Sequence, residues 1–368
     1  MTDDAGRSAP WPARYELLDG LRGLAALAVV LHHHGVAGLG HPAVMVFFVI
    51  SGYCITAATV AALASGSASF GAFMARRMRR IFPPYLFALA FFALTRVIRD
   101  AFDRGAGPPD DPVAWLQNLT MTQWLSLLVQ PGPDPANNPT LFVAAFWSLN
   151  YEEQFYLVMA IVLLLCRARP ARFPVAIVAI TTASACWLWL AGANTFRGLF
   201  VEYWPHFATG AALCLVLTQS SFARWRGAFA ATMLAVSAGC VLALAGESTD
   251  RSRLFLEFAV IGATVAALVA ARPLSGWISG TQAWRPIAAL GTISYSLYLV
   301  HQFNLTLTGT LAAKLVGGLR SAPLEVAVAV ALQLLIATVF WYGCERPYLN
   351  RGAARLPHGA PVAVAGRS

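Results

Sequence analysis

The chain has 368 residues, of which 58% are hydrophobic and only 12% are charged, and its mean hydropathy is +0.61. Soluble globular proteins carry about 25% charged residues, so this composition excludes a soluble enzyme. The net charge of +9 does not indicate nucleic-acid binding, because the basic residues lie between the apolar stretches. The apolar runs are also too continuous for a membrane β-barrel. We therefore predict an all-α, polytopic membrane protein.

Ten apolar stretches are long enough to cross a bilayer core of roughly 30 Å. They are predicted to form one membrane domain, residues 17–348, between an N-terminal segment, 1–16, and a disordered tail, 349–368. The apolar segment 113–130 contains several Gln, Asn and Thr residues, so we interpret it as an interfacial or re-entrant part of a long loop. The predicted spans are 18–37, 41–64, 81–99, 141–165, 173–193, 199–218, 227–246, 253–271, 286–308 and 324–343.

The distribution of charge predicts how these spans are oriented. If the N-terminus is cytoplasmic, seventeen of the 26 Lys and Arg residues lie in cytoplasmic segments and six lie on the opposite side. Cytoplasmic segments of membrane proteins carry this excess of basic residues. We therefore predict cytoplasmic N- and C-termini and a multi-pass protein of the cytoplasmic (inner) membrane, with the lipid bilayer as a partner and no nucleic acid.

The first span carries Asp19, Arg22 and three consecutive histidines, and ionisable residues inside a span are functional candidates. Arg22 and His33 lie within about 20° of the same helical face and roughly 16 Å apart along the axis. Asp19 is positioned to pair with Arg22. His32 and His34 point about 100° to either side, so this run cannot hold one metal ion, and we predict no metal site. His33 is a candidate general base; the alternative is a hydrogen bond that packs helices together.

The fourth span contains two adjacent carboxylates, Glu152 and Glu153. Consecutive helical residues face different directions, so we expect the two to have different roles, one orienting a base and the other bracing helices. The sequence does not distinguish which is catalytic. The alternative is that the span begins later and both carboxylates lie at a wet boundary.

Four arginines, Arg76, Arg77, Arg79 and Arg80, occur in the connection after the second span, and Pro83 and Pro84 are predicted to start the third span. Arginine suits phosphate binding, and this connection is predicted to be cytoplasmic, where nucleotide-like cofactors are found. The alternative is charge that sets the topology and contacts anionic lipids.

Three further ionisable positions occur in later spans. His301 is predicted to lie well inside the ninth span, after several hydroxyl residues. Glu202 and His206 are four residues apart, a spacing at which their side chains can pair with each other. Glu345 is interpreted as a boundary residue at the cytoplasmic end of the tenth span.

Six motifs follow one another along nearly the whole chain: Leu18–Leu27 with His33, Phe47–Tyr53, Arg76–Tyr85, Trp147–Tyr156, Ser294–His301 and Glu345–Pro347. In this order they resemble the integral-membrane O-acyltransferases of the acyltransferase-3 family. The resemblance implies ten spans and transfer of an acyl group, often acetyl, from acyl-CoA to a hydroxyl, usually on a sugar. It also implies a signature of a basic residue, ten residues and then histidine, which selects Arg22 and His33.

The resemblance implies that the donor is acyl-CoA, preferably acetyl-CoA, and that the acceptor is a sugar-containing molecule. We expect no metal to take part. Direct transfer is favoured, although an acyl-histidine on His33 stays open. Alternative functions are O-acylation of a glycosylated natural product such as a macrolide, and transport of a glycan or lipid-linked precursor. The candidates are His33, Glu152, Glu153, Arg22 and Asp19 for catalysis, Arg76, Arg77, Arg79, Arg80 and Tyr85 for the donor, and Trp147, Ser148, Tyr295 and His301 for the acceptor.

Overall fold

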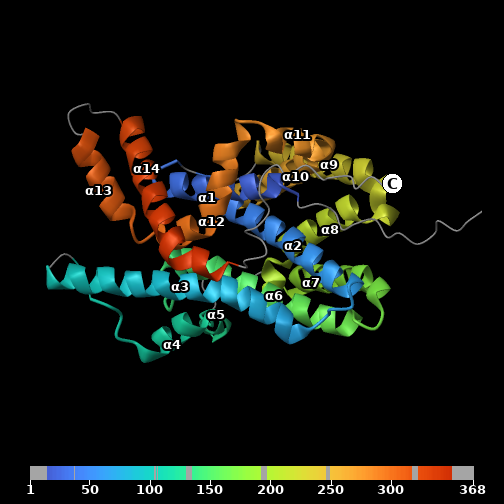
Figure 1. Cartoon of the computed structure of the whole chain (residues 1–368), viewed down its shortest axis with the longest axis horizontal. Helices are drawn as coiled ribbons and strands as arrows, with labels where there is room; N and C mark the ends of the chain where they lie inside the picture. Colours follow the sequence, from blue (N-terminus) through green and yellow to red (C-terminus); the bar gives the residue numbers. More distant parts are fainter. Residues whose placement is uncertain are drawn as a thin grey trace, which may run out of the picture.

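The computed structural model describes residues 15–36, 38–102, 105, 107–129, 135–191, 197–245, 249–316 and 322–349. Within these ranges the chain is helical and contains no strand, which confirms the predicted all-α fold. The predicted N-terminal segment up to residue 14 and the predicted tail from residue 350 lie outside the described residues. The helices (Figure 1) are α1 Leu17–His33, α2 Gly40–Ala64, α3 Phe70–Ala101, α4 Pro112–Thr120, α5 Trp124–Val129, α6 Trp147–Cys166, α7 Phe173–Ala191, α8 Trp204–Thr218, α9 Arg226–Leu244, α10 Thr249–Ala271, α11 Ser275–Gly280, α12 Trp284–Val300, α13 Leu305–Val316 and α14 Ala322–Phe340.

Seven helical segments in the described part of the chain are long and apolar enough to cross a membrane, so the prediction of a polytopic membrane protein is confirmed. They correspond to seven of the ten predicted spans. The other three predicted spans fall on shorter helices, 18–37 on α1, 199–218 on α8 and 286–308 on α12. Ten crossings and the side on which the termini lie stay predictions.

The ninth predicted span is interrupted. Helix α12 ends at Val300 and α13 begins at Leu305, so His301 lies in the turn between them and not well inside a span. Polar groups satisfy the backbone at this break: the side chain of Asn304 donates to the Val300 carbonyl at 3.0 Å, and Gln333 of α14 donates to the His301 carbonyl at 2.9 Å. Such side-chain bonds compete with helix continuation.

The predicted connection that contains the four arginines is helical. Ser69 caps α3 by accepting a hydrogen bond from the amide of Ala72 at 3.3 Å, so the helix starts well before the arginines. Pro83 and Pro84 therefore lie inside α3 instead of starting it, a position that membrane helices tolerate. The helical structure of this connection matters for the site, because neighbouring side chains of a helix project from different faces.

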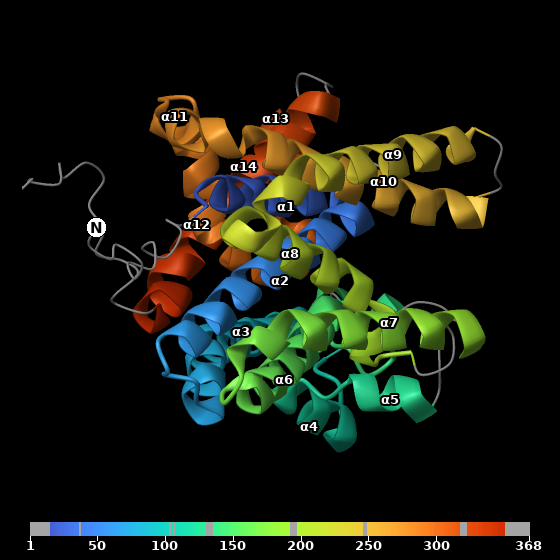
Figure 2. The same cartoon turned by 90° about the vertical axis from the view of Figure 1, so that its right-hand side faces the viewer.

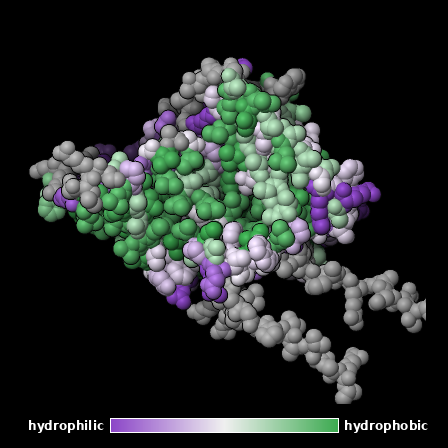
Figure 3. All heavy atoms as spheres, turned by 90° about the horizontal axis from the view of Figure 1, so that it is seen from above, coloured by the Kyte–Doolittle hydropathy of each residue, from purple (hydrophilic) through white to green (hydrophobic). Residues whose placement is uncertain are grey.

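The segment 113–130 forms no single span. It folds into α4 and α5, separated at Met121, which adopts a left-handed φ of 54°. In Figures 1 and 2, α4 and α5 lie on one side of the molecule, beneath α3, and the pairs α9–α10 and α13–α14 lie on the opposite side. Figure 3 shows a broad hydrophobic surface on that opposite side, as expected for contact with lipid. Leu242 of α9 and Val339 of α14 are among the exposed apolar side chains.

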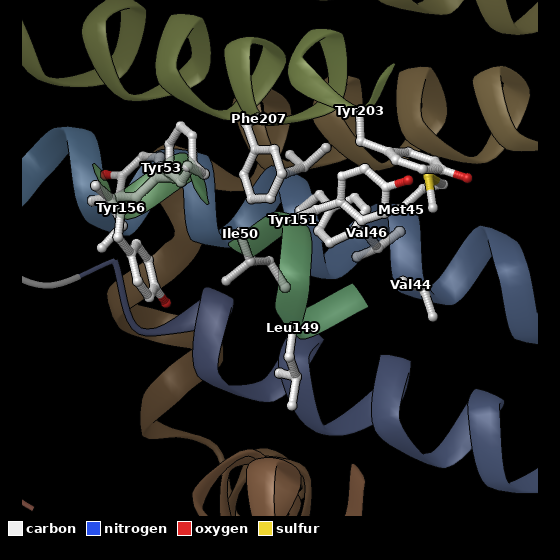
Figure 4. Close-up of a cluster of buried hydrophobic side chains, with 14 of the residues drawn as sticks. Val44, Met45, Val46, Ile50, Tyr53, Leu149, Tyr151, Tyr156, Tyr203 and Phe207 are labelled. Carbon is white, nitrogen blue, oxygen red and sulfur yellow. The ribbon is translucent and has the colours of Figure 1, made fainter. Parts of the chain in front are cut away.

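Close glycine contacts bring the central helices together. Helices α1 and α12 run in parallel, and a Cβ at Gly23 would lie 2.5 Å from the amide nitrogen of Gly291. Gly210 of α8 similarly lies against the backbone of α2. Small residues allow helix backbones to approach in this way in membranes. Apolar side chains of α2, α6 and α8, including Ile50 and Phe207, fill the adjoining core (Figure 4).

Candidate active site

A cavity of about 90 Å³ lies among α1, α2, α3, α6 and α12. Its charged lining residues are Arg22, Arg77, Arg80 and Glu152, so three of the candidate arginines and one of the two candidate glutamates meet in one place. Charged groups at membrane depth are costly, and this concentration marks the cavity as the candidate active site. The remaining polar lining residues are Ser51, Cys54, Ser148, Tyr156, Ser294, Tyr295 and Tyr298.

Arg22 is held by groups on two helices. Its Nη1 lies 3.4 Å from the carboxylate of Asp19, so the ion pair predicted from their spacing is present. Its Nη2 lies 3.6 Å from the sulfur of Cys54 on α2. These contacts fix the guanidinium at the cavity wall.

The two adjacent glutamates are separated as predicted for consecutive helical residues. Glu152 Oε1 accepts a hydrogen bond from Ser51 of α2 at 2.7 Å and a second from Tyr156, one turn further along α6. Glu153 does not belong to the cavity lining, in which Glu152 is the only carboxylate among the described residues. The geometry therefore favours Glu152 over Glu153 for contact with a bound substrate.

Helix α3 divides the four arginines. Arg77 and Arg80, three residues apart, line the cavity, whereas the side chains of Arg76 and Arg79 are exposed. The guanidinium of Arg77 lies 6.0 Å from the ring centroid of Tyr156, within the range of a cation–π contact. Only two of the four predicted donor-binding arginines therefore line this cavity.

Two of the predicted acceptor-binding residues, Ser148 and Tyr295, line the cavity. Tyr295 donates to the carbonyl of Ile81 on α3 at 3.0 Å. Tyr298 donates to the Ala145 carbonyl at 2.6 Å, so the Ser148 hydroxyl, 2.7 Å away, donates to Tyr298. Hydroxyl groups from α6 and α12 thus form part of the cavity lining.

Tyr85 and Trp147 lie elsewhere. The buried Tyr85 donates to the carbonyl of Asn118 at 2.6 Å and accepts from Gln123 at 3.2 Å, so it holds the α4–α5 segment against α3. Trp147 stacks on His41, with ring centroids 5.6 Å apart and an interplanar angle of 8°. The structure places neither residue in the cavity lining.

The histidine beside His33 is His301. Their ring centroids are 5.1 Å apart; His33 is exposed and His301 is fully buried. The Nδ1 of His301 lies 2.8 Å from the Tyr298 carbonyl. A carbonyl only accepts, so Nδ1 carries the proton and the unpartnered Nε2 of the neutral ring carries a lone pair. The structure thus places a histidine, and not Glu152 or Glu153, beside His33.

Tyr298 connects this histidine pair to the cavity. Its ring lies 5.7 Å from that of His301, and the same side chain lines the cavity. His33 itself lies beyond the lining, at the opposite end of α1 from Arg22, in keeping with the roughly 16 Å expected along the helix. The candidate site is therefore elongated, with arginines and Glu152 at one end and two imidazoles at the other.

Several buried ionisable residues were missed or misread from the sequence. Glu257 forms an ion pair with His41. Its position inside the predicted span 253–271 could have identified it from the sequence as a functional candidate. The expected pairing of Glu202 with His206 is wrong: Glu202 accepts from Tyr151 at 2.5 Å, and both ring nitrogens of His206 lack a partner.

Glu345, interpreted as a boundary residue, is buried and accepts hydrogen bonds from the amide and hydroxyl of Ser296, at 3.1 Å and 2.5 Å. It therefore ties the end of the last helix to α12. Across the described part of the chain, no three His, Cys, Asp or Glu side chains are grouped closely enough to hold a metal ion.

Residues 15–342 match the family of the acyltransferase domain, which covers most of the chain. The chain belongs to this family. The predicted family is thereby confirmed. No solved structure matches the chain.

Three curated proteins are similar to parts of this chain. A Bacillus subtilis protein named as the putative peptidoglycan O-acetyltransferase YrhL is 31% identical over 311 residues, which are 77% of this chain and 47% of that protein. "Protein 2 in picA locus" of Rhizobium radiobacter is 39% identical over 152 residues, 38% of this chain and 78% of that protein. An uncharacterized Haemophilus influenzae protein is 32% identical over 125 residues, 33% of this chain and 48% of that protein. The chain thus spans about half the length of the Bacillus relative.

Proposed function

We propose that the chain transfers an acyl group, preferably acetyl, from acyl-CoA to a sugar hydroxyl of an exported or cell-surface glycan, in the cytoplasmic membrane. The observation that carries this proposal is the elongated site, in which Arg22, Arg77 and Arg80 lie at one end and His33 and His301 at the other. The name of the Bacillus relative, a putative peptidoglycan O-acetyltransferase, supports a glycan acceptor.

The donor enters at the arginine end. Arg77 and Arg80 contact the phosphates of CoA, since guanidinium groups bind phosphate with two parallel hydrogen bonds. The lining residues of α6 extend from Tyr156 to Ser148, about 12 Å along the helix. A cavity of about 90 Å³ is too small for the nucleotide, so only the thioester end of the donor enters it and approaches Tyr298. The nucleotide then stays outside at the predicted cytoplasmic face.

The histidine end performs the transfer. The oxygen of the acceptor hydroxyl bonds to the acyl carbon, the carbon–sulfur bond breaks, and His33 removes the hydroxyl proton and passes it to the departing thiolate. The neutral ring of His301 lies beside His33, and its lone pair favours the imidazolium that forms on His33. Because His33 is exposed, it remains accessible to a large acceptor.

The test is release of free thiol from acetyl-CoA by the purified chain in lipid nanodiscs, with and without a soluble glycan fragment. The proposal predicts acceptor-dependent thiol release and an acetyl ester on the glycan. Thiol release that does not depend on the acceptor, or the absence of an acetyl ester on every sugar tested, would contradict the proposal.

A further inference from the structure

Contacts across the cavity of the candidate active site show that its two ends differ. At one end, the guanidinium of Arg77 lies 6.0 Å from the ring centroid of Tyr156 on α6. One turn earlier on α6, Glu152 belongs to the same lining. A further turn earlier, Ser148 donates to Tyr298 of α12 at 2.7 Å. The cavity therefore runs along α6 from an arginine end to an end at Tyr298, which we call the tyrosine end.

Apolar side chains gather at the tyrosine end. The ring of Phe47, from α2, lies 5.8 Å from that of Tyr298 at an interplanar angle of 63°, and both rings line the cavity. Leu149 follows Ser148 on α6 and also belongs to the lining. Figure 4 shows that Leu149 points away from Phe207 and from the apolar core around it. The tyrosine end thus offers apolar surface, whereas the guanidinium groups lie at the other end.

Hydrogen bonds hold the ring at the tyrosine end in place. Tyr298 is 7% exposed, and its hydroxyl donates to the carbonyl of Ala145 and accepts from Ser148. Displacing this ring would leave buried polar groups unpaired, which is costly. Carbon atoms added beside it must therefore fit against Phe47 and Leu149, and overfilling a packed space is unfavourable.

We infer that Phe47 and Leu149 determine the length of the acyl group that the chain transfers, by limiting the space beside Tyr298 to a group about as small as acetyl. The inference rests on the proposed function, in which the thioester end of the donor approaches Tyr298, and it names the residues that select the donor. The carbonyl carbon of the thioester lies near Tyr298. The remaining carbon atoms of the acyl group pack against Phe47 and Leu149, because apolar groups are more stable away from water.

A matched pair of substitutions tests the inference. Leu149→Ala and Ile55→Ala remove equal numbers of carbon atoms from buried residues of the same cavity. Leu149 lies at the tyrosine end. Ile55 lies at the arginine end, next to Cys54, whose sulfur is 3.6 Å from Arg22. Only Leu149→Ala should therefore change the preference for acyl length.

The kinetic test measures kcat/KM for acetyl-CoA and for butyryl-CoA with the full chain in nanodiscs and a soluble glycan fragment as acceptor. The unmodified chain should prefer acetyl-CoA by about tenfold, because the two additional methylene groups overfill the tyrosine end. Leu149→Ala should shift the ratio about tenfold toward butyryl-CoA, since the methylene groups are then buried without overfilling. Phe47→Ala should shift the ratio in the same direction, and Ile55→Ala should leave it unchanged.

A ratio measured within one variant does not depend on how much of that variant folds. Equal ratios in Leu149→Ala and Ile55→Ala would overturn the inference, as would an unmodified chain that uses both donors equally well.

A binding test does not depend on turnover. S-ethyl-CoA and S-butyl-CoA are unreactive thioethers with the chain lengths of acetyl-CoA and butyryl-CoA, and equilibrium dialysis measures their affinities. The unmodified chain and Ile55→Ala should bind S-ethyl-CoA about tenfold more tightly, whereas Leu149→Ala should bind the two compounds about equally. Equal affinities in the unmodified chain would overturn the inference. The expected affinities without acyl transfer to any acceptor would contradict the proposed function and leave the acyl-length assignment standing.

Discussion

The division of the four arginines by α3 allows a charge-matched test of donor binding. The double variant Arg77→Gln/Arg80→Gln removes two guanidinium groups from the cavity wall, whereas Arg76→Gln/Arg79→Gln removes two from exposed positions. Both variants lose the same charge next to the same membrane face. Effects on topology or on lipid attraction should therefore be equal in the two, and a difference between them reports the cavity.

The expected size of the difference follows from the contacts. A hydrogen bond to a charged group contributes about 1.5–3 kcal/mol, so two lost phosphate contacts amount to at least about 3 kcal/mol. At about 1.4 kcal/mol per factor of ten, KM for acetyl-CoA should rise by about 100-fold in the cavity variant. The exposed variant should change KM less than about threefold, because solvent-exposed contacts contribute little.

The assay measures initial rates of thiol release over a range of acetyl-CoA concentrations at saturating acceptor. S-acetylpantetheine, which lacks the nucleotide phosphates, serves as a second donor, and its KM should be nearly the same in the unmodified chain and both variants. The reasoning is refuted if both double variants raise KM for acetyl-CoA equally, or if the cavity variant binds acetyl-CoA as the unmodified chain does.

Three further substitutions test other parts of the site and fold. His33→Ala should reduce transfer by about 10²–10⁴-fold, the usual contribution of a general base, with an unchanged melting temperature in detergent; near-full activity would remove His33 from the mechanism. Glu152→Gln should lower kcat/KM at least about tenfold by weakening the hydrogen bonds from Ser51 and Tyr156, whereas Glu153→Gln should have a smaller effect; the reverse order would show that the wrong glutamate was chosen. Gly23→Leu should destabilise the chain by at least about 1–3 kcal/mol, because α1 and α12 are in backbone contact there, and unaltered thermal unfolding would contradict that packing.

Helical periodicity within one element was the most reliable guide to the site. It placed Arg22 and Asp19 together, and the ion pair is present at 3.4 Å. It also separated Glu152 from Glu153, which a helix requires of consecutive residues. These inferences needed only the local geometry of a single helix.

Contacts between different helices were harder to predict from the sequence. The proximity of His33 and His301 depends on α1 and α12 lying in parallel, and that packing follows from glycine contacts that no sequence spacing reveals. The arginines were misplaced because two prolines suggested a helix start, while Ser69, further upstream, caps the helix. Glu257 was readable as a carboxylate inside a predicted span, but its partner His41 comes from α2, more than two hundred residues earlier.

The central claim is that donor and acceptor meet across the membrane, with acyl-CoA at the Arg77 end and the sugar at the His33 end. Its most direct test uses proteoliposomes in which the chain has a single orientation, with acetyl-CoA on one side and the glycan acceptor on the other. We predict acetylated glycan when acetyl-CoA is supplied only on the side of Arg77 and the acceptor only on the opposite side. Transfer that requires both substrates on the same side would contradict the account.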